Sequence, residues 1–291
     1  MKRGLAYLLL GLAAYVVFLV VKLPAQQLYG RLAPALESRL PLQLHQLEGP
    51  WWDGRARQVV WGRRSFEDLR WRLHAPELLR GRLAFRLDLA LPVDGMGGTN
   101  GSGAAPAPRL QVVAALAPDG TLYLRDGRTR VGLALLDRLF NPAPLGLQGG
   151  LRLELQRLVW ATGSGGGQTD APADSGPSKG RLVELEATVR LEGVGLGPPV
   201  DVQLGDFLAT FSTAREGEGL VEGKIEDQGG PLQVQGLVRI RPDGSYRLTA
   251  ELAARDPQQR AIVQALKLLG NPSPAGKVSV VRTGRLAFFG R

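Results

Sequence analysis

Side chains that could carry acid–base or metal chemistry are scarce in this chain. Its 291 residues include two histidines, His45 and His74, and no cysteine. Each histidine lies in an alternating polar and apolar segment, where a solvated strand position explains it better than a general base or a metal ligand. So few imidazoles without any thiolate argue against a transition-metal site, although carboxylates remain able to hold a hard cation. We predict no catalytic histidine and no metal site.

Three further segments resemble known sites only in part. Glu67 and Asp68 are adjacent carboxylates, which we interpret as a turn and not as an acid–base pair. Residues 219–224, GLVEGK, are one residue short of a phosphate-binding loop, and Ile225 stands where that loop needs serine or threonine. Residues 193–198, GVGLGP, lack the final glycine of a dinucleotide-binding fingerprint. The sequence therefore predicts a protein that is not an enzyme and that binds no cofactor.

Tryptophans are the better candidates for a binding surface. Trp51 and Trp52 are adjacent between two glycines that permit sharp turns, and Trp61 and Trp71 follow at strand positions. The structural interpretation is a corner where aromatic rings cap the core, and it is the one we favour. The functional interpretation is a docking surface, because exposed aromatic rings suit interfaces and membrane borders. We take these four residues as the candidate interaction site.

The N-terminal segment would place such a surface at a membrane. From Gly4 to Val21 the chain carries no charge. At about 1.5 Å per helical residue, this length covers most of a hydrocarbon core roughly 30 Å thick. A cleaved signal peptide is the alternative, but its apolar core usually has only about 7–15 residues. We predict that residues 1–24 form one uncleaved transmembrane helix, and Lys2 and Arg3 favour a cytoplasmic N-terminus.

Period-two alternation dominates the rest of the chain. Apolar side chains alternate with polar or small ones in residues 83–91, 151–156, 183–191 and 246–252. This pattern is typical of antiparallel strands that pack on one face only. We predict that residues 42–291 form a mainly β domain, either an antiparallel β-sandwich or a curved open sheet with a few short helices.

Three segments differ from this pattern. Residues 25–41 carry leucines at four-residue spacing, which predicts a short amphipathic helical connector, interrupted around Pro34. Residues 94–108 and 162–179 are rich in glycine, serine, alanine and proline, and bury too little apolar area to become ordered. Because each lies between alternating strands, we interpret both as hairpin tips and not as domain linkers.

The β domain also contains an internal repeat. Both copies have a strand, a Pro-Asp-Gly turn, a helical segment and an Asn-Pro-x-Pro sequence in the same order. The shared features begin at Leu110 and Leu232, turn at Pro118 and Pro242, and end at Asn141 and Asn271. This order indicates a duplication with candidate halves 42–148 and 149–291. In the second copy we expect Asp256 to be the N-cap of the helix.

The net charge of +9 comes mostly from arginines. A basic chain can bind nucleic acid or an anionic membrane surface. Here the arginines alternate with apolar residues along strands, as in residues 69–73 (LRWRL), and form no dense block with aromatic rings. We therefore favour a solvated arginine-rich face, expect no nucleic-acid partner, and keep lipid headgroups of the inner membrane as a partner.

Several short motifs, taken in order, resemble protein N of the bacterial type II secretion system. They are Leu23-Pro24-Ala25, the segment from Gly49 to Ala56, Leu69-x-Trp71-x-Leu73, Leu78-Leu79, Gly81-Arg82-Leu83, the hairpin from Gly236 to Leu248, Leu269-Gly270 and Gly284-x-Leu286. The resemblance covers the chain from the apolar segment nearly to the C-terminus. Pro50 stands where this family usually has threonine, so any role of that hydroxyl is in doubt here.

The resemblance implies a single-pass inner-membrane protein whose main body lies in the periplasm. It implies an accessory, non-enzymatic scaffolding component of the apparatus that exports folded proteins across the outer membrane, with other secretion components as partners. The alternative is a periplasmic lipid-binding or lipid-transfer module, since one-sided apolar strands can form a groove for acyl chains.

Overall fold

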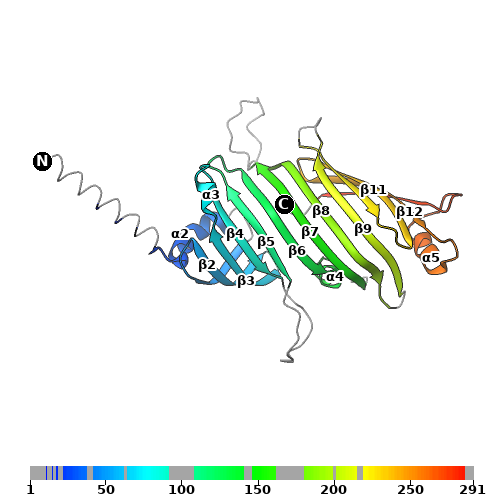
Figure 1. The fold of residues 1–291 in the computed structure, drawn as a ribbon, viewed down its shortest axis with the longest axis horizontal. Coiled ribbons are helices and arrows are strands. Elements are labelled where there is room, and N and C mark those ends of the chain that lie inside the picture. Colours follow the sequence, from blue (N-terminus) through cyan, green and yellow to red (C-terminus); the bar gives the residue numbers. More distant parts are fainter. Residues whose placement is uncertain are drawn as a thin grey trace.

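One antiparallel sheet makes up most of the protein. The computed structural model describes residues 22–37, 42–61, 64–91, 108–140, 146–161, 180–198, 201–214 and 219–285, together with residues 11, 15 and 18. Within these residues, thirteen strands pair in chain order, so that β1 lies at one edge and β13 at the other (Figure 1). The strands are β1 (Leu42–Glu48), β2 (Asp53–Trp61), β3 (Arg64–Leu73), β4 (Leu83–Ala90), β5 (Arg109–Leu116), β6 (Leu122–Gly132), β7 (Leu147–Ala161), β8 (Arg181–Leu196), β9 (Val202–Thr213), β10 (Val221–Asp227), β11 (Leu232–Ile240), β12 (Ser245–Ala254) and β13 (Val278–Arg285).

The open-sheet alternative is confirmed and the sandwich is wrong. A sandwich needs connections that carry the chain from one sheet to a second sheet. Here every connection instead joins two neighbouring antiparallel strands of the same sheet. The described helices are short: α2 (Ala25–Glu37), α3 (Ala75–Leu78), α4 (Leu133–Phe140) and α5 (Arg260–Leu269). The prediction of a mainly β protein with a few short helices is therefore confirmed.

The predicted membrane anchor, residues 1–24, lies largely outside the described residues. Among those that are described, no helix combines the length and the apolar character needed to cross a bilayer. The helical connector is present as α2, but the interruption expected around Pro34 is wrong, because α2 continues through this residue. A proline inside a helix removes one backbone hydrogen bond, which can bend a helix without ending it.

The register gives the sheet one apolar and one polar face. Directly opposite residues share a face, so a row across the strands reports the character of that face. One row on the apolar face, from β4 to β8, consists of Phe85, Ala114, Leu124, Leu158 and Leu185. One row on the polar face, across the same strands, consists of Asp88, Gln111, Arg128, Glu154 and Thr188.

Buried apolar clusters lie on the apolar face of the C-terminal strands. One cluster joins Phe207 of β9 to Val234 of β11 and to Leu133 of α4. A second joins Ile262 and Leu266 of α5 to β13 and also reaches β9. Because β9 and β11 are not neighbours, contact between them requires the sheet to curve toward its apolar face. The helices α4 and α5 therefore cover part of the apolar face of these strands.

Residues 183–191 depart from the predicted alternation at one position. Val159 lies opposite Glu184 but Trp160 lies opposite Leu182, so Val183 is an additional residue in a β-bulge. As a result Leu182 is buried in a cluster of its own with Val221 and Ile240, whereas Val183 is exposed. The expectation that Val183 shares the apolar face is wrong, because the alternation does not reveal a bulge.

The two copies of the repeat have the same elements in the same order. Strands β5 and β6 with α4 correspond to strands β11 and β12 with α5. In both turns the carboxylate of the aspartate accepts a hydrogen bond of 2.9 Å from the backbone two residues later, Thr121 N–H or Ser245 N–H. The expected N-cap at Asp256 is wrong: α5 begins at Arg260, and Asp256 accepts from Gln258 N–H in a preceding turn. The division into duplicated halves stays a prediction.

The interiors of the two low-complexity segments lie outside the described residues. The strands that each one joins, β4 with β5 and β7 with β8, pair directly with one another.

Candidate interaction surface

Trp51, in the turn between β1 and β2, and Trp71 of β3 form a packed corner. The indole N–H of Trp71 donates to the Trp51 carbonyl at 2.8 Å. The Trp71 ring also covers Gly54 so closely that a Cβ there would lie 2.4 Å from the ring. Trp51 in turn meets Phe85 of β4 edge to face, with ring centroids 6.3 Å apart. These contacts explain why this stretch needs a glycine beside large aromatic residues.

The corner is tied to the beginning of α2. Ala25 N–H donates to the Gly49 carbonyl at 3.0 Å, and Trp51 N–H donates to the Leu23 carbonyl at 3.2 Å. Gly49 has a φ of +87°, which a side chain would strain. Pro50 forms an isolated bridge with Pro24. The segment that follows the predicted anchor is therefore attached to the sheet through the turn that carries the tryptophans.

The four candidate tryptophans do not form one site. Trp51, Trp52 and Trp71 are half-buried at the β1–β2 turn and on β3. Trp61 lies at the opposite end of β2, where its backbone pairs with Leu42 and Arg64. Their role in docking stays a prediction, and the contacts of Trp51 and Trp71 support the structural interpretation of the corner.

The other candidate chemical residues are separate. His45 lies on β1 opposite Gln58, and His74 precedes α3 without capping it through its side chain. Within the described part of the chain, no group of three or more histidine, aspartate or glutamate side chains could hold a metal ion. In the segment GLVEGK, Lys224 is a strand residue paired with Glu226 at 2.6 Å. Residues 221–224 of this segment therefore belong to strand β10 and not to a phosphate-binding loop.

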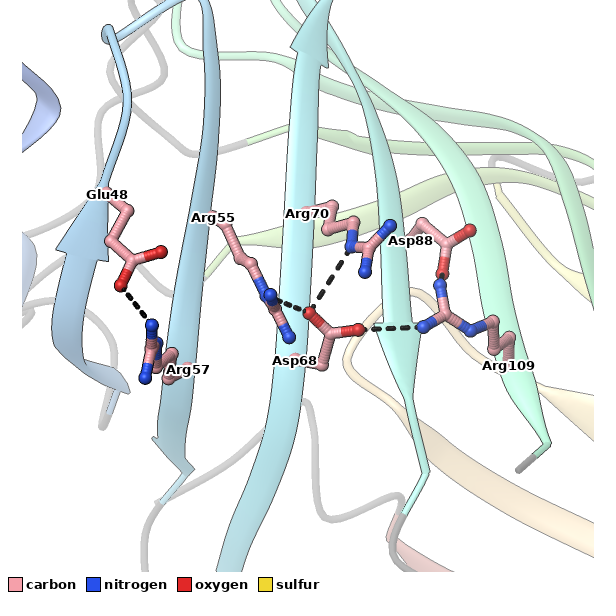
Figure 2. A network of polar contacts seen from close by, with 7 residues as sticks. All are labelled: Glu48, Arg55, Arg57, Asp68, Arg70, Asp88 and Arg109. Atoms are coloured by element: carbon pink, nitrogen blue, oxygen red, sulfur yellow. Dashed lines mark hydrogen bonds and ion pairs between the residues drawn. The ribbon is translucent and has the colours of Figure 1, made fainter. Parts of the chain in front are cut away.

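Asp68 is the centre of a charged cluster on the polar face (Figure 2). The expected turn at Glu67 and Asp68 is wrong, because both lie within β3, at a bulge that gives Asp68 a φ of +55°. The Asp68 carboxylate pairs with Arg55 of β2, with Arg70 at 3.3 Å and with Arg109 of β5 at 2.7 Å. A bulge re-aims a side chain, and here it points one carboxylate at three guanidinium groups.

In the Asp68 cluster each charged group has an oppositely charged partner, and we call such a cluster closed. Arg109 also pairs with Asp88 at 2.8 Å, and Gln111 donates to the same carboxylate at 3.0 Å. Burial by itself raises the pKa of Asp68, but the hydrogen bonds from the three arginines outweigh it, so the pKa lies below its usual 3.8. The cluster therefore connects β2, β3, β4 and β5 through charge-assisted hydrogen bonds.

Glu77 is the centre of a second charged cluster. Its side chain is only 2% exposed, although it lies in the short helix α3. It pairs with Arg125 of β6 and with Arg80 at 2.7 Å, and Arg82 lies 4.0 Å away. Burial alone raises the pKa of Glu77, but the hydrogen bonds from Arg125 and Arg80 outweigh this effect and hold the pKa below its usual 4.5. The cluster fastens α3 to the sheet.

Exposed leucines lie at the end of the sheet beside α3. Leu79, which follows α3, is 92% exposed, and Leu78 is also exposed. Leu83 and Leu116 lie opposite one another where β4 begins and β5 ends, and both are exposed. Large exposed apolar side chains that occur together often mark interaction sites. The sequence motifs include Leu78-Leu79 and Leu83 only as part of the family resemblance, and no sequence pattern indicates that these leucines are exposed together.

Comparison with known proteins identifies relatives over the whole sheet. Residues 41–281 match the family model for the type II secretion system (T2SS), protein N. The type II secretion system protein N of Aeromonas hydrophila is 26% identical over 296 residues, covering 98% of this chain and 100% of that protein. The protein of the same name from Vibrio cholerae serotype O1 (strain ATCC 39315 / El Tor Inaba N16961) is 42% identical over 83 residues, covering 28% of this chain and 31% of that protein. No solved structure matches the chain.

Proposed function

Because the chain belongs to the family of type II secretion system protein N, we propose that it is a non-catalytic interaction subunit of that system. The observation that carries the proposal is the family match over residues 41–281, which includes the sheet from β1 to the middle of β13. The proposed partners are other components of the secretion apparatus. Its place would be the inner membrane, where it supports the export of folded proteins across the outer membrane.

The organisation of the chain suits such a subunit. In this proposal residues 1–24 cross the inner membrane once, and residues 42–291 form the periplasmic body. Residues 25–41 connect the two. A tether confines a binding surface near the bilayer and raises its effective concentration for neighbouring components. The attachment of α2 to the tryptophan corner would then fix the orientation of the sheet relative to the membrane.

The exposed leucines beside α3 are the proposed contact for another component. Leu79 has the largest exposed fraction of the large apolar side chains in the described part of the chain. Its substitution by serine should leave the fold intact, because the side chain has little to pack against. Burial of such a side chain in a partner is worth roughly 1.5–3 kcal/mol.

The test is secretion together with site-specific crosslinking. Deletion of the gene should reduce export of a type II cargo protein, and expression of the chain should restore it. A photoreactive residue at position 79 should capture a secretion component, whereas the same residue at exposed Lys267 of α5 serves as the matched control. Unchanged secretion after deletion would contradict the proposal.

A lipid-binding or lipid-transfer module is the second candidate function. It is favoured by the apolar face of β4–β6, where side chains such as Phe85, Leu87 and Leu124 are only half-buried and belong to none of the three buried clusters. Native mass spectrometry after gentle extraction should then detect a phospholipid bound to the protein. A protein that carries no lipid under these conditions would rule this candidate out.

A further inference from the structure

Three arginines lie directly opposite one another on neighbouring central strands. Arg130 of β6 pairs with Arg152 of β7, which pairs with Arg190 of β8. Side chains in such positions have Cβ atoms about 4.5–5.5 Å apart, and like charges there destabilise a sheet. These three residues, here called the arginine row, therefore concentrate positive charge on the polar face.

The carboxylates around the arginine row do not neutralise it. Arg152 pairs with Glu192 at 3.4 Å, but its Nε is buried without a hydrogen-bond acceptor. Arg130 and Arg190 are exposed, and neither has an ion-pair partner among the residues that the structure describes. Of the three guanidinium groups, only that of Arg152 therefore has a carboxylate partner among the described residues.

The Asp68 cluster also contains arginines that lie opposite one another on this face, but there a carboxylate neutralises them. Arg55 and Arg70 are also directly opposite one another, on β2 and β3. There the Asp68 carboxylate lies between them and accepts hydrogen bonds from both (Figure 2). The arginine row also places arginines directly opposite one another, but no carboxylate of the described residues lies between them.

We propose that the arginine row binds carboxylate side chains of an acidic segment in a partner protein. The carboxylate is chosen because it is the group that completes the Asp68 cluster, and arginine forks match its geometry. An anionic membrane would require a continuous positive surface, whereas Glu154 and Glu192 interrupt the positive charge here. This inference rests on the proposed function, in which the partner is another secretion component.

The test is a binding measurement with the full-length protein in a neutral detergent. The probe is a short fluorescent peptide of alternating glutamate and serine, and the control peptide has glutamine in place of glutamate. The variant carries both Arg130→Gln and Arg190→Gln, two exposed positions. Removal of these charge-assisted hydrogen bonds should weaken binding of the glutamate peptide about tenfold.

A matched control is Arg247→Gln, which removes one exposed arginine from β12, outside the row. It should bind the glutamate peptide like the parent protein. An Arg190→Lys variant keeps the charge but loses the planar fork, so its binding should be intermediate. Thermal unfolding of each variant will show that the comparison is between folded proteins.

Three results would overturn the proposal. They are equal binding by the parent and the double variant, equal binding of the glutamate and glutamine peptides, and a variant-sensitive affinity for short-chain phosphatidylglycerol without any for the peptide. The two proposals fail in different experiments. Normal secretion in a strain that lacks the protein would contradict the proposed function, whereas only the peptide measurement tests binding by the arginine row.

Discussion

The Asp68 cluster and the arginine row both place arginines directly opposite one another on neighbouring strands, with opposite results. In the first, arginines on β2, β3 and β5 surround a carboxylate that a bulge supplies from within the sheet. In the second, three arginines lie on β6, β7 and β8, and among the described residues only Arg152 has a carboxylate partner, Glu192 at 3.4 Å. A closed cluster stabilises the fold, whereas an open row costs stability and leaves charge available for a ligand. The comparison therefore separates the part of the polar face that holds the sheet together from the part that can bind.

The largest effect is expected at Glu77, the most buried of the closed carboxylates. Glu77→Ala should lower the free energy of unfolding by about 3 kcal/mol, because it leaves the guanidinium groups of Arg80 and Arg125 without their partner. The measurement is the urea midpoint followed by tryptophan fluorescence. An exposed control, Glu251→Ala, removes only a surface pair with Lys277 and should change stability by less than about 1 kcal/mol. Equal urea midpoints for Glu77→Ala and Glu251→Ala would contradict a large contribution of Glu77 to stability.

A smaller loss is expected at Asp68. Asp68→Asn removes the charge but keeps a residue that tolerates the positive φ of the bulge. It should lower the free energy of unfolding by about 1.5 kcal/mol. Asp53→Asn is the matched control, because among the described residues the carboxylate of Asp53 pairs only with the exposed Arg72, at 3.3 Å. If Asp53→Asn were as damaging as Asp68→Asn, the closed cluster would not be a special source of stability.

The closed carboxylates should also make stability depend on acid pH. The pKa values of Asp68 and Glu77 are held below their usual 3.8 and 4.5 by arginine hydrogen bonds that outweigh burial. The stability that they contribute is therefore fully present above these usual values and is lost as the pH falls through the lowered ones. Urea midpoints measured between neutral and acid pH should fall more steeply for the parent than for the variant with Asp68→Asn and Glu77→Gln. Parallel curves would show that other groups govern acid unfolding.

The smallest effect is expected in the arginine row and has the opposite sign. Arg190→Gln should leave the free energy of unfolding unchanged or raise it by a few tenths of a kcal/mol, since it separates like charges. Arg70→Gln, in the closed cluster, should lower it. A loss of stability at Arg190 as large as that at Arg70 would mean that the row is already neutralised.

The sequence predicted the elements well and the charged clusters poorly. Alternation in residues 83–91 predicts β4, because a strand with one buried face produces this pattern. The two Pro-Asp-Gly sequences predict the turns of both equivalent hairpins. Asp68 was interpreted as a turn, because nothing local in its neighbourhood indicates a β-bulge. Its arginine partners come from strands up to 41 residues away, so only the register brings them together. The same register, and no motif, reveals the arginine row.

The strict chain-order pairing of the strands has a consequence for how the molecule is built. Each strand needs only the preceding one as a template, so the sheet can grow hairpin by hairpin without waiting for a distant segment. A chain that emerges gradually during synthesis can therefore pair its strands from the N-terminal side while the remainder is still being made. Truncation after a complete hairpin would remove the later strands. Of the strands that remain, only the last would lose a pairing partner.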